Sequence, residues 1–403
     1  MRGERWLGLV GIGEDGLDGL TPAALRLVKQ AALVVGGRRH LALAGPLEAK
    51  TMTWPSPIEN ALDVIEAHRA GSVCVLASGD PFFFGVGAML MRRFAAGEMI
   101  CVPAPSAFAL AAARLGWSEQ DCALISLHGR PLEAIIPHLS DGARILALSW
   151  DDATPAKLAA LLTARGMGRS KLTICEAMGG PRERICTRQA GDFALDNVAA
   201  LNTIALEVVA DPGSRVLPRA AGLPDDWFEH DGQITKREIR AMTLSQLAPR
   251  RGELLWDVGS GSGSIAIEWT LADAANNAVA IERRHDRAER IARNALSFGV
   301  PALSIVTGDA PQVFADLPKP DAIFIGGGAG APGMIERAWG ALGSGGRLVA
   351  NAVTLETQAA CVDWRARFGG ELAQVAVAHA EPIGRYLSWR AAAPIVQWRL
   401  VKS

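Results

Sequence analysis

The stretch LLWDVGSGSGSIAI, residues Leu254–Ile267, decides the fold of the second half of this chain. It opens with an apolar run typical of a buried parallel strand, passes through Asp257, and continues into three alternating glycines, Gly259, Gly261 and Gly263. We expect a helix after the last glycine. A loop without side chains lets the backbone approach a ligand closely, and the helix beyond it offers unpaired N–H groups. The stretch therefore predicts a strand, a ligand-binding loop and a helix.

The next strand, Ala278–Ile281, ends in Glu282, an acid placed where the ribose hydroxyls of a bound nucleoside would lie. The glycine spacing is G-x-G-x-G rather than the G-x-G-x-x-G of dinucleotide sites, and Asp257 stands where an amino group would need a carboxylate. These two details favour S-adenosylmethionine as the cofactor. After a further strand, Asp309 and Ala310 are positioned to meet an adenine edge. The candidate cofactor residues of this half are Gly259, Ser260, Gly261, Ser262, Gly263, Glu282, Asp309 and Ala310.

Composition limits the class of protein. The 403 residues are too many for one typical domain and indicate two or three. The net charge of −1 and the lack of a dense Lys/Arg run argue against nucleic acid or a membrane surface as a partner, so we expect a small-molecule substrate. The six cysteines form no C-x-x-C and the seven histidines no H-E-x-x-H. We therefore expect no metal site, no disulfides and a reducing cytoplasm.

The chain divides into two predicted α/β halves. From Trp6 onward, apolar strands alternate with helices, which indicates a mostly parallel, helix-flanked sheet, and a second lobe begins near Cys122. The Pro- and Gly-rich residues 211–224 mark the boundary between the halves. The expected domains are 1–213, with lobes of about 1–118 and 119–213, a linker over 214–226, and 227–403. The last two predicted strands, Leu372–Ala378 and Ile395–Val401, have the spacing of an antiparallel hairpin.

In the front half, the sequence Ser78-Gly79-Asp80-Pro81 follows a predicted strand. A carboxylate fixed at the C-terminal end of a parallel strand sits where open α/β sheets bind ligands, although Asp80 could equally close a type I turn. The three aromatic residues Phe82–Phe84 could line a pocket for a flat macrocycle, but packing in a core is the default expectation. Ser106 should cap a helix that runs to Leu115, and it contacts a cofactor only if that turn faces the ligand.

In the back half, the candidate acid–base groups are His230 and Asp231, just upstream of the glycine-loop strand. They are either solvated surface or part of a lid over the site. Gly326–Gly328 follow another strand and either expose backbone to the substrate or form only a loose turn. The connection of the final hairpin carries polar residues that either clamp carboxylates or face solvent, namely Tyr386, Arg385 and Arg390.

Both halves resemble known families over nearly the whole chain. In the front half, LVGIG, LASGDPFFFG, PAPSAFALAAARLGW and ISLHGRP resemble the tetrapyrrole methylases of the cobalamin pathway. In the back half, GLPDDWFEHDGQITKREIR, LLWDVGSGSGSIAIEW, GDAP, IFIGGG and GGRLVANAVTLE resemble the decarboxylating methyltransferases that act with them. The order of the halves resembles that of the bifunctional, decarboxylating methyltransferases of this pathway.

The resemblance implies a two-lobed class III methylase fold in front and a seven-stranded, Rossmann-like class I methyltransferase domain behind. It implies transfer of a methyl group from S-adenosylmethionine to C5 of a reduced precorrin-6 tetrapyrrole by the front half and to C15 by the back half. Loss of the ring C acetate carboxyl would then give a precorrin-8. A homo-oligomer is expected. Cofactor contacts are implied at Ser78, Gly79, Asp80, Ser106, Ala107 and Thr235. One position departs from the family: Glu14 stands where many relatives have Pro, so no contact is assigned to that turn.

The expected methyl transfer depends on alignment of the methyl donor with the acceptor carbon more than on a strong base. A sulfonium methyl is already activated, and holding the reactants in line contributes about 7–11 kcal/mol. Loss of carbon dioxide requires an acid to protonate the resulting carbon, and His230 and Asp231 are the candidates. Two alternatives stay open: a methyltransferase fusion that acts on another planar substrate, and a non-catalytic module that senses adenosine ligands.

Overall fold

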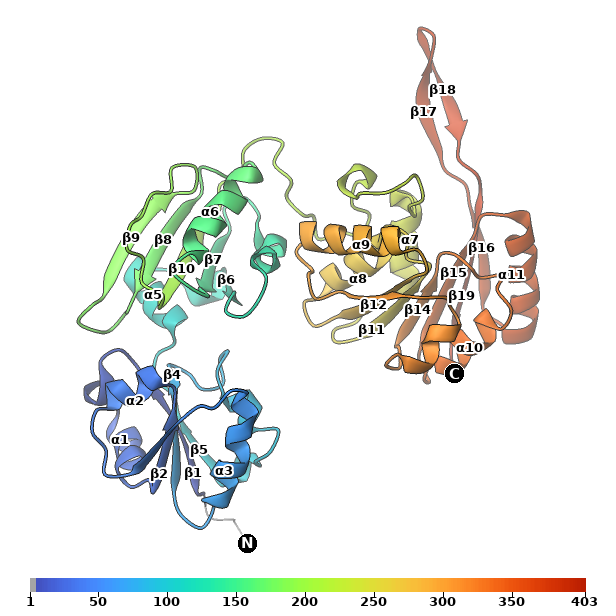
Figure 1. Ribbon diagram of the computed structural model, residues 1–403. Coiled ribbons are helices and arrows are strands. Elements are labelled where there is room, and N and C mark those ends of the chain that lie inside the picture. Colours follow the sequence, from blue (N-terminus) through green and yellow to red (C-terminus); the bar gives the residue numbers. More distant parts are fainter. Residues whose placement is uncertain (1–4) are drawn as a thin grey trace. The chain divides into compact units, whose positions relative to one another are not determined.

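The structure is a computed structural model that describes residues 5–403. These residues form two compact units, one of residues 5–132 with 138–216 and one of residues 133–137 with 217–403. Figure 1 labels the helices and strands. Short 3-10 helices lie at Gly16–Gly19, Ile58–Asn60, Ala96–Glu98, Glu119–Asp121, Leu132–His138, Asp225–Trp227 and Gln312–Asp316.

The first lobe of the front unit is a parallel sheet of order β3-β2-β4-β1-β5. Its strands are β1 (Leu7–Ile12), β2 (Leu33–Gly36), β3 (Lys50–Thr53), β4 (Val73–Ser78) and β5 (Met99–Val102). Its helices are α1 (Pro22–Lys29), α2 (Arg38–Ala44), α3 (Ala61–Ala67) and α4 (Gly87–Leu90). The central strands β1 and β4 are almost wholly buried because helices cover both faces of the sheet, as a continuous apolar strand requires. The predicted parallel sheet is confirmed.

The second lobe is a mixed sheet of order β6-β7-β10-β8-β9 in which only β6 and β7 are parallel. Its elements are β6 (Cys122–Ser126), β7 (Arg144–Leu148), α6 (Thr154–Ala164), β8 (Lys171–Glu176), β9 (Arg184–Gln189) and β10 (Asn202–Glu207). Helix α5 (Ala107–Leu115) comes before this lobe in the chain, yet its buried residues Phe108, Ala111 and Ala112 pack against β7 and β10. The chain therefore crosses to the second sheet directly after β5.

The back unit contains a seven-stranded sheet of order β13-β12-β11-β14-β15-β19-β16, with β19 antiparallel to both of its neighbours. Its strands are β11 (Leu254–Val258), β12 (Asn277–Glu282), β13 (Ser304–Thr307), β14 (Ala322–Ile325), β15 (Arg347–Ala352), β16 (Glu371–Val375) and β19 (Ile395–Val401). Its helices are α7 (Arg237–Leu247), α8 (Ser264–Ala272), α9 (His285–Ser297), α10 (Met334–Ala341) and α11 (Leu355–Phe368). The strand order reverses between β11 and β14, which is where open α/β sheets bind ligands.

Two separate cores cover the faces of this sheet. Successive residues of β12 point to opposite faces of the sheet and so belong to different cores. Ala278 and Ala280 pack in the core with α8 and α9, whereas Val279 and Ile281 pack in the core with α10 and α11. Figure 1 shows these helices on the two faces. The predicted Rossmann-like domain is confirmed. No helix among residues 5–403 is long and apolar enough to cross a bilayer.

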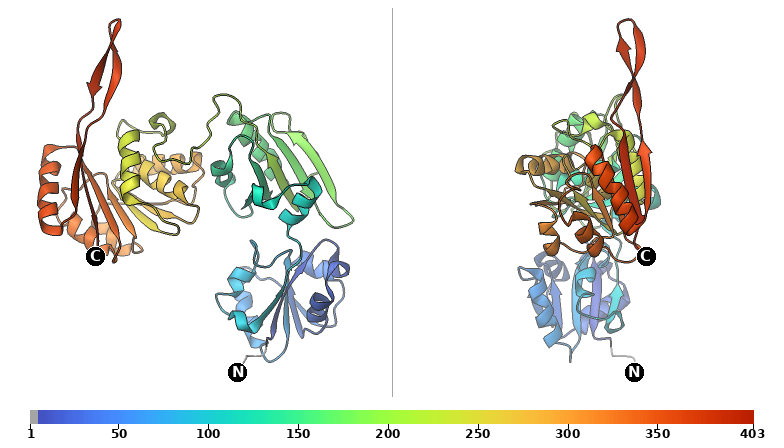
Figure 2. Two further views of the ribbon diagram at one scale, coloured as in Figure 1. Left: turned by 180° about the vertical axis from the view of Figure 1, so that it is seen from behind. Right: turned by 90° about the vertical axis from the view of Figure 1, so that its right-hand side faces the viewer.

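The final antiparallel pair is also confirmed, with β16 paired to β19. Its connection was not expected to be structured. It forms a separate two-stranded sheet of β17 (Ala378–Ile383) and β18 (Tyr386–Ala391), which extends away from the rest of the back unit in both Figures 1 and 2.

Candidate functional site

The glycine loop after β11 adopts a backbone conformation that only glycine enters without strain. Gly259, Gly261 and Gly263 have φ of 72°, 61° and 79°. A Cβ at Gly259 would lie 2.9 Å from the backbone nitrogen of Gly327, and one at Gly263 would lie 2.8 Å from a methyl carbon of Ile291. The glycines after β14 are therefore not a loose turn, because they pack directly against the loop after β11. Two bare backbones meet where the strand order reverses.

Asp257 lies at the base of this loop and is fully buried. One carboxylate oxygen, Oδ2, accepts hydrogen bonds from the Ser260 hydroxyl at 2.7 Å and from the Ala266 amide at 3.1 Å. The other oxygen, Oδ1, has no hydrogen-bond partner among residues 5–403, and the same is true of the buried Ser262 hydroxyl. Burial raises the pKa of Asp257 to about 6, although the bonds from Ser260 and Ala266 act in the opposite direction. A buried acceptor without a donor fits a ligand that brings a cationic N–H group.

Glu282 ends β12 on the neighbouring side of the loop and is also buried. Its carboxylate accepts hydrogen bonds from the Gly261 amide at 3.0 Å and from the Arg284 amide at 3.1 Å. The Gly308 amide donates to the Glu282 carbonyl at 3.1 Å, which places Asp309 and Ala310 beside this strand end. The structure thus brings the predicted residues of three successive strand ends together.

A segment upstream of α7, Glu229–Lys236, lies over the glycine loop, and we call it the lid segment. A Cβ at Gly261 would lie 3.5 Å from the Gln233 carbonyl oxygen. Buried Asn294 of α9 ties the lid to the loop, because it exchanges hydrogen bonds with the Glu229 backbone at 2.8 and 3.0 Å and donates to the Ser262 carbonyl at 2.8 Å. The predicted contact Thr235 belongs to this segment.

The two candidate acid–base groups of the lid differ in environment. Asp231 pairs with Arg287 at 2.9 Å and with Arg290 at 3.4 Å. Burial alone would raise the pKa of Asp231, but hydrogen bonds from the Gln233 amide and from Arg287 outweigh it and lower the pKa to about 2. His230 is exposed, and its Nδ1 accepts a hydrogen bond from the Gly232 amide at 3.0 Å. Asp231 is therefore an ionised anchor for the lid at neutral pH.

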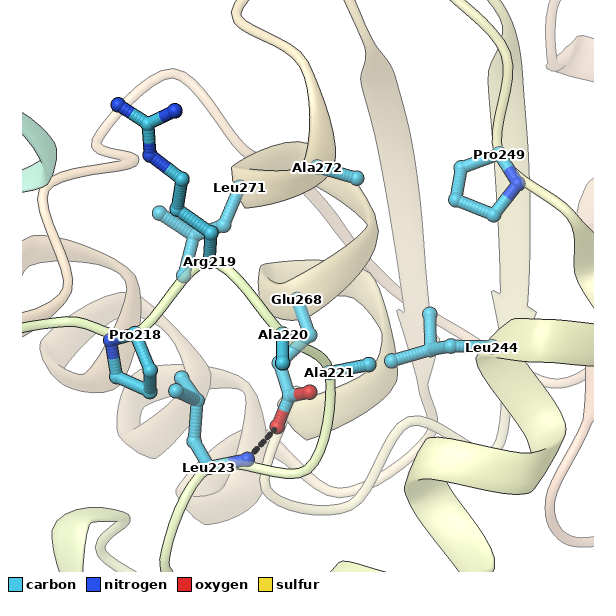
Figure 3. A pocket seen from close by; sticks show the side chains of 10 residues that line it. All are labelled: Pro218, Arg219, Ala220, Ala221, Leu223, Leu244, Pro249, Glu268, Leu271 and Ala272. Atoms are coloured by element: carbon cyan, nitrogen blue, oxygen red, sulfur yellow. Dashed lines mark hydrogen bonds between the residues drawn. The ribbon is translucent and has the colours of Figure 1, made fainter.

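A buried ionic network holds the start of α7 in place. Arg240 is fully buried and donates to Glu268 of α8 at 2.6 Å and to Asp225 at 3.1 Å. Glu268 also accepts hydrogen bonds from the amides of Gly222 and Leu223 at 2.6 and 3.0 Å. Figure 3 shows Glu268 beside a cavity of about 80 Å³ under residues 218–223. That cavity has room for only a few waters and does not adjoin the glycine loop, so it is not a cofactor site.

In the front unit, the ends of β1, β4 and β5 converge. A Cβ at Gly11 would lie 1.9 Å from the Gly79 carbonyl oxygen, and that oxygen accepts a hydrogen bond from the Ala104 amide at 3.1 Å. Gly79 has φ of 55°, and a Cβ there would lie 2.9 Å from Cα of Ser106. Ser106 caps α5 through the Ala109 amide at 3.1 Å, as predicted, and Ala107 is the first residue of that helix. The backbones of the three strand ends therefore approach one another closely.

Asp80 begins a turn, because its carbonyl accepts a hydrogen bond from the Phe83 amide at 3.1 Å and its Oδ1 accepts one from the Phe82 amide at 2.8 Å. The default expectation for the three aromatic residues was wrong: Phe82, Phe83 and Phe84 are 46%, 37% and 45% exposed. Phe83 and Phe84 contact Phe108 edge-on, with ring centroids 5.2 and 5.9 Å apart. The three rings therefore form a partly exposed aromatic surface that follows Asp80 in the chain.

Ser78 is held by residues that sequence reasoning missed. Arg39 donates to the Ser78 hydroxyl at 2.6 Å, and Nε2 of His40 lies 2.8 Å from the same oxygen. Arg39 also pairs with Glu14, the residue that replaces Pro in the first turn. Burial, and then the charge of Arg39, lower the pKa of His40 to about 4, so the imidazole is neutral at physiological pH. The only sequence signal for this cluster was the unusual Glu14 itself.

The two arginines of the final hairpin contact different partners within the hairpin. Arg390 pairs with Glu381 at 3.1 Å, and Arg385 donates to the Tyr386 hydroxyl at 3.0 Å. Arg385 lies in the turn between β17 and β18, and all four of these residues are exposed.

Comparisons with known proteins agree with both units. Residues 7–194 match the family model of the tetrapyrrole (corrin/porphyrin) methylases, and residues 226–402 match that of the precorrin methyltransferase domain. The fold and the two strand-end sites thus define a two-domain methyltransferase.

The chain is 55% identical to a precorrin-6Y C(5,15)-methyltransferase (decarboxylating) from Sinorhizobium sp., over 98% of this chain and 96% of that protein. It therefore belongs to the precorrin-6Y C(5,15)-methyltransferase (decarboxylating) family.

Two shorter relatives each match less than half of this chain. The cobalt-precorrin-7 C(5)-methyltransferase of Salmonella typhimurium is 33% identical over 44% of this chain and 88% of its own length. The protein named “Probable cobalt-precorrin-6B C(15)-methyltransferase (decarboxylating)” of Pyrobaculum calidifontis is 38% identical over 43% of this chain and 92% of its own length. In these relatives the names assign the C5 and C15 activities to separate proteins.

Proposed function

We propose that this chain methylates the reduced precorrin-6 ring at C5 in the front half and at C15 in the back half. It also removes the carboxyl of the ring C acetate as carbon dioxide, giving a precorrin-8. The observation that carries this proposal is the 55% identity to a bifunctional relative over 98% of the chain, which spans both strand-end sites. The proposed domain boundary is the linker of residues 214–226. It fits this division because the match to the tetrapyrrole methylases ends at residue 194 and the match to the precorrin methyltransferase domain begins at residue 226. The six free thiols fit a cytoplasmic location.

S-adenosylmethionine, when bound, supplies the activated methyl group. In the back half, the unpartnered Oδ1 of Asp257 suits its amino group and Glu282 suits its ribose hydroxyls, with the Gly259–Gly263 loop against the nucleoside. Asp309, Ala310 and Thr235 complete the proposed set. In the front half, the proposed contacts are Ser78, Gly79, Asp80, Ser106 and Ala107.

Alignment is the main task of these residues. A rigid glycine loop and a lid anchored by Asp231 and Asn294 hold the ligands in line and exclude water, which is the source of the rate gain. The exposed Phe82–Phe84 rings offer a flat apolar surface on which a macrocycle can stack.

Decarboxylation requires a proton for the carbon that loses carbon dioxide. Because the salt bridges keep Asp231 ionised, we assign the acid role to His230 and the anchoring role to Asp231. Replacing His230 with Gln should slow carbon dioxide release and leave C5 methylation intact. Asp231→Asn should instead raise the KM for the cofactor in the back half.

The direct test supplies the full chain with precorrin-6Y and S-adenosylmethionine labelled with ¹³C in its methyl group. We expect a product with two labelled methyls and one carboxyl fewer, with the label at C5 and C15 by NMR. Binding of cofactor without transfer would favour a sensing module, and transfer only to other planar acceptors would favour a different substrate.

A further inference from the structure

The hydroxyl of Ser78, at the end of β4, is approached by two side chains from the start of α2. Arg39 donates from Nη2 to the Ser78 oxygen at 2.6 Å, and Nε2 of His40 lies 2.8 Å from the same oxygen. The two nitrogens, Nη2 and Nε2, are themselves 3.1 Å apart. Which of these groups donates and which accepts depends on the imidazole nitrogen that carries the proton.

The backbone beside His40 decides where that proton lies. The Gly37 amide donates to Nδ1 of His40 at 3.3 Å, and a backbone N–H can only donate. Nδ1 therefore carries no proton, so the proton of the neutral imidazole is on Nε2. The doubly protonated form is absent at neutral pH, because burial and the charge of Arg39 lower the pKa of His40 to about 4. Nε2 thus cannot accept from Arg39 and donates to the Ser78 oxygen.

Two donors on one oxygen restrict what the Ser78 hydroxyl can do. A hydroxyl has two lone pairs and one proton. Arg39 and His40 occupy both lone pairs, so Ser78 can enter a further hydrogen bond only as a donor. Ser78 is exposed, and its proton has no acceptor among residues 5–403. Donation from the guanidinium cation also polarises the O–H group and makes it a stronger donor. This proton is therefore available to an acceptor on a ligand.

Glu14 holds Arg39 in this position. The two side chains form an ion pair through Nη1 of Arg39, and the Glu14 side chain is only 7% exposed. Glu14 packs against the loop between β8 and β9 of the second lobe. A Cβ at Gly180 would lie 2.5 Å from Cβ of Glu14, and Arg182 lies 3.7 Å from Oε2 of Glu14. One guanidinium therefore bridges Glu14 and Ser78, which gives the acid in the first turn a structural role.

We propose that Arg39 and His40 are positioning residues that make Ser78 an obligate hydrogen-bond donor to a carboxylate of the bound ligand. This inference rests on the proposed function, in which two ligands carry carboxylates, namely the methionyl end of the cofactor and the acid side chains of the tetrapyrrole. A hydroxyl that only donates selects acceptors and rejects amino groups. A charged acceptor gains most, because charge-assisted hydrogen bonds are about twice as strong as neutral ones.

The test is equilibrium titration of the full chain with S-adenosylhomocysteine and, separately and without oxygen, with precorrin-6Y. Ser78→Ala removes the donor and should weaken the binding of one of these ligands about tenfold or more. If the carboxylate is that of the cofactor, one of the two S-adenosylhomocysteine binding components weakens and the other does not. The preference of that component over the decarboxylated analogue then falls by the same factor. If the carboxylate is that of the tetrapyrrole, only the affinity for precorrin-6Y falls.

Double variants test whether the two positioning residues act through Ser78. His40→Phe keeps a ring and removes the donor, and Arg39→Lys keeps the charge beside Glu14 but loses the fork that reaches Ser78. Each should weaken the same ligand by a smaller factor than Ser78→Ala. Combined with Ser78→Ala, neither should weaken binding further, because the group they position is already gone. Losses that add would show independent structural roles and would overturn the positioning.

Ser72→Ala is the matched control. Ser72 directly precedes the same strand, and its hydroxyl donates within the chain to the Gln30 carbonyl at 2.6 Å. This variant should leave both affinities unchanged, and far-UV circular dichroism should show every variant folded. Affinities for both ligands that Ser78→Ala does not change would overturn the proposal. A wild type that binds but does not methylate C5 would overturn the proposed function instead, because the titrations require no methyl transfer.

Discussion

Asp257 illustrates how one residue serves binding at the expense of stability. It is fully buried, it leaves one oxygen without a donor, and its pKa is raised to about 6. If the carboxylate holds the amino group of the cofactor, binding requires its ionised form. The ionised fraction rises about tenfold between pH 5 and pH 7 for such a pKa. We therefore expect the back half to bind S-adenosylhomocysteine about tenfold more tightly at pH 7 than at pH 5.

Isothermal titration of the full chain checks this prediction. The pH dependence of the back-half affinity should disappear in Asp257→Asn. Binding of S-adenosylhomocysteine by the front half should persist in that variant. Equal affinity of the back half at both pH values would show that Asp257 does not contact the cation.

The same residue predicts a pH-dependent stability. Because its pKa in the folded chain, about 6, exceeds the unfolded value of about 3.9, the protonated form favours folding. That contribution is fully present below pH 4 and is lost as the pH rises through 6, a change of about 3 kcal/mol. We expect the ligand-free wild type to lose stability relative to Asp257→Asn between pH 4 and pH 7. Thermal unfolding of both chains at each pH measures this difference, and a constant difference would contradict it.

The sequence could predict Asp257 and Glu282 but not the residues that fix their surroundings. Both acids sit at fixed offsets from strands and glycines, so a local pattern locates them. Asn294, Arg287 and Arg39 act through contacts with segments 25 to 65 residues away along the chain. Nothing in the local pattern distinguishes them from solvated side chains on a helix.

At the scale of elements, the glycine loop is the part whose geometry depends most strictly on residue type. Gly259→Ala forces a side chain into left-handed backbone, which costs of order 1–3 kcal/mol, and places Cβ 2.9 Å from the Gly327 nitrogen. We expect a lower melting temperature and loss of C15 methylation, with C5 methylation retained. Product analysis and thermal unfolding measure both effects.

Gly340 provides the control for that substitution. It lies in α10, its φ is not positive, and no atom would lie within 4 Å of an added Cβ. Gly340→Ala should stabilise the chain by about 0.5–1 kcal/mol through helix propensity and leave both methylations unchanged. Loss of activity in both variants would show a general sensitivity to side chains rather than a role for the loop.

Element prediction succeeded where a segment has its own core face. Periodicity located the buried strands, and the cap Ser106 fixed the start of α5. It failed for β3, β9, β17 and β18, whose residues are mostly exposed. Such strands are specified by pairing with a neighbouring strand rather than by burial in their own unit, so an apolar core pattern does not reveal them.

At the scale of the whole molecule, the chain carries two compact units, each with its own core and its own strand-end glycine site. Each site is built from residues of its own unit, so the two methylations should be separable. Asp80→Asn keeps the oxygen that accepts from the Phe82 amide while removing the charge, and it should abolish C5 methylation alone. Gly259→Ala should abolish C15 methylation alone.

A mixture of these two full-length variants tests whether the intermediate passes through solution. Each variant by itself should give a singly methylated ring, at C15 for Asp80→Asn and at C5 for Gly259→Ala. Because each variant retains one intact site, the equimolar mixture should restore the doubly methylated product, with the rate rising as protein concentration increases. Mass spectrometry with ¹³C-labelled methyl groups follows all three species. A mixture that yields only singly methylated rings would show instead that the substrate must stay on one chain for both reactions.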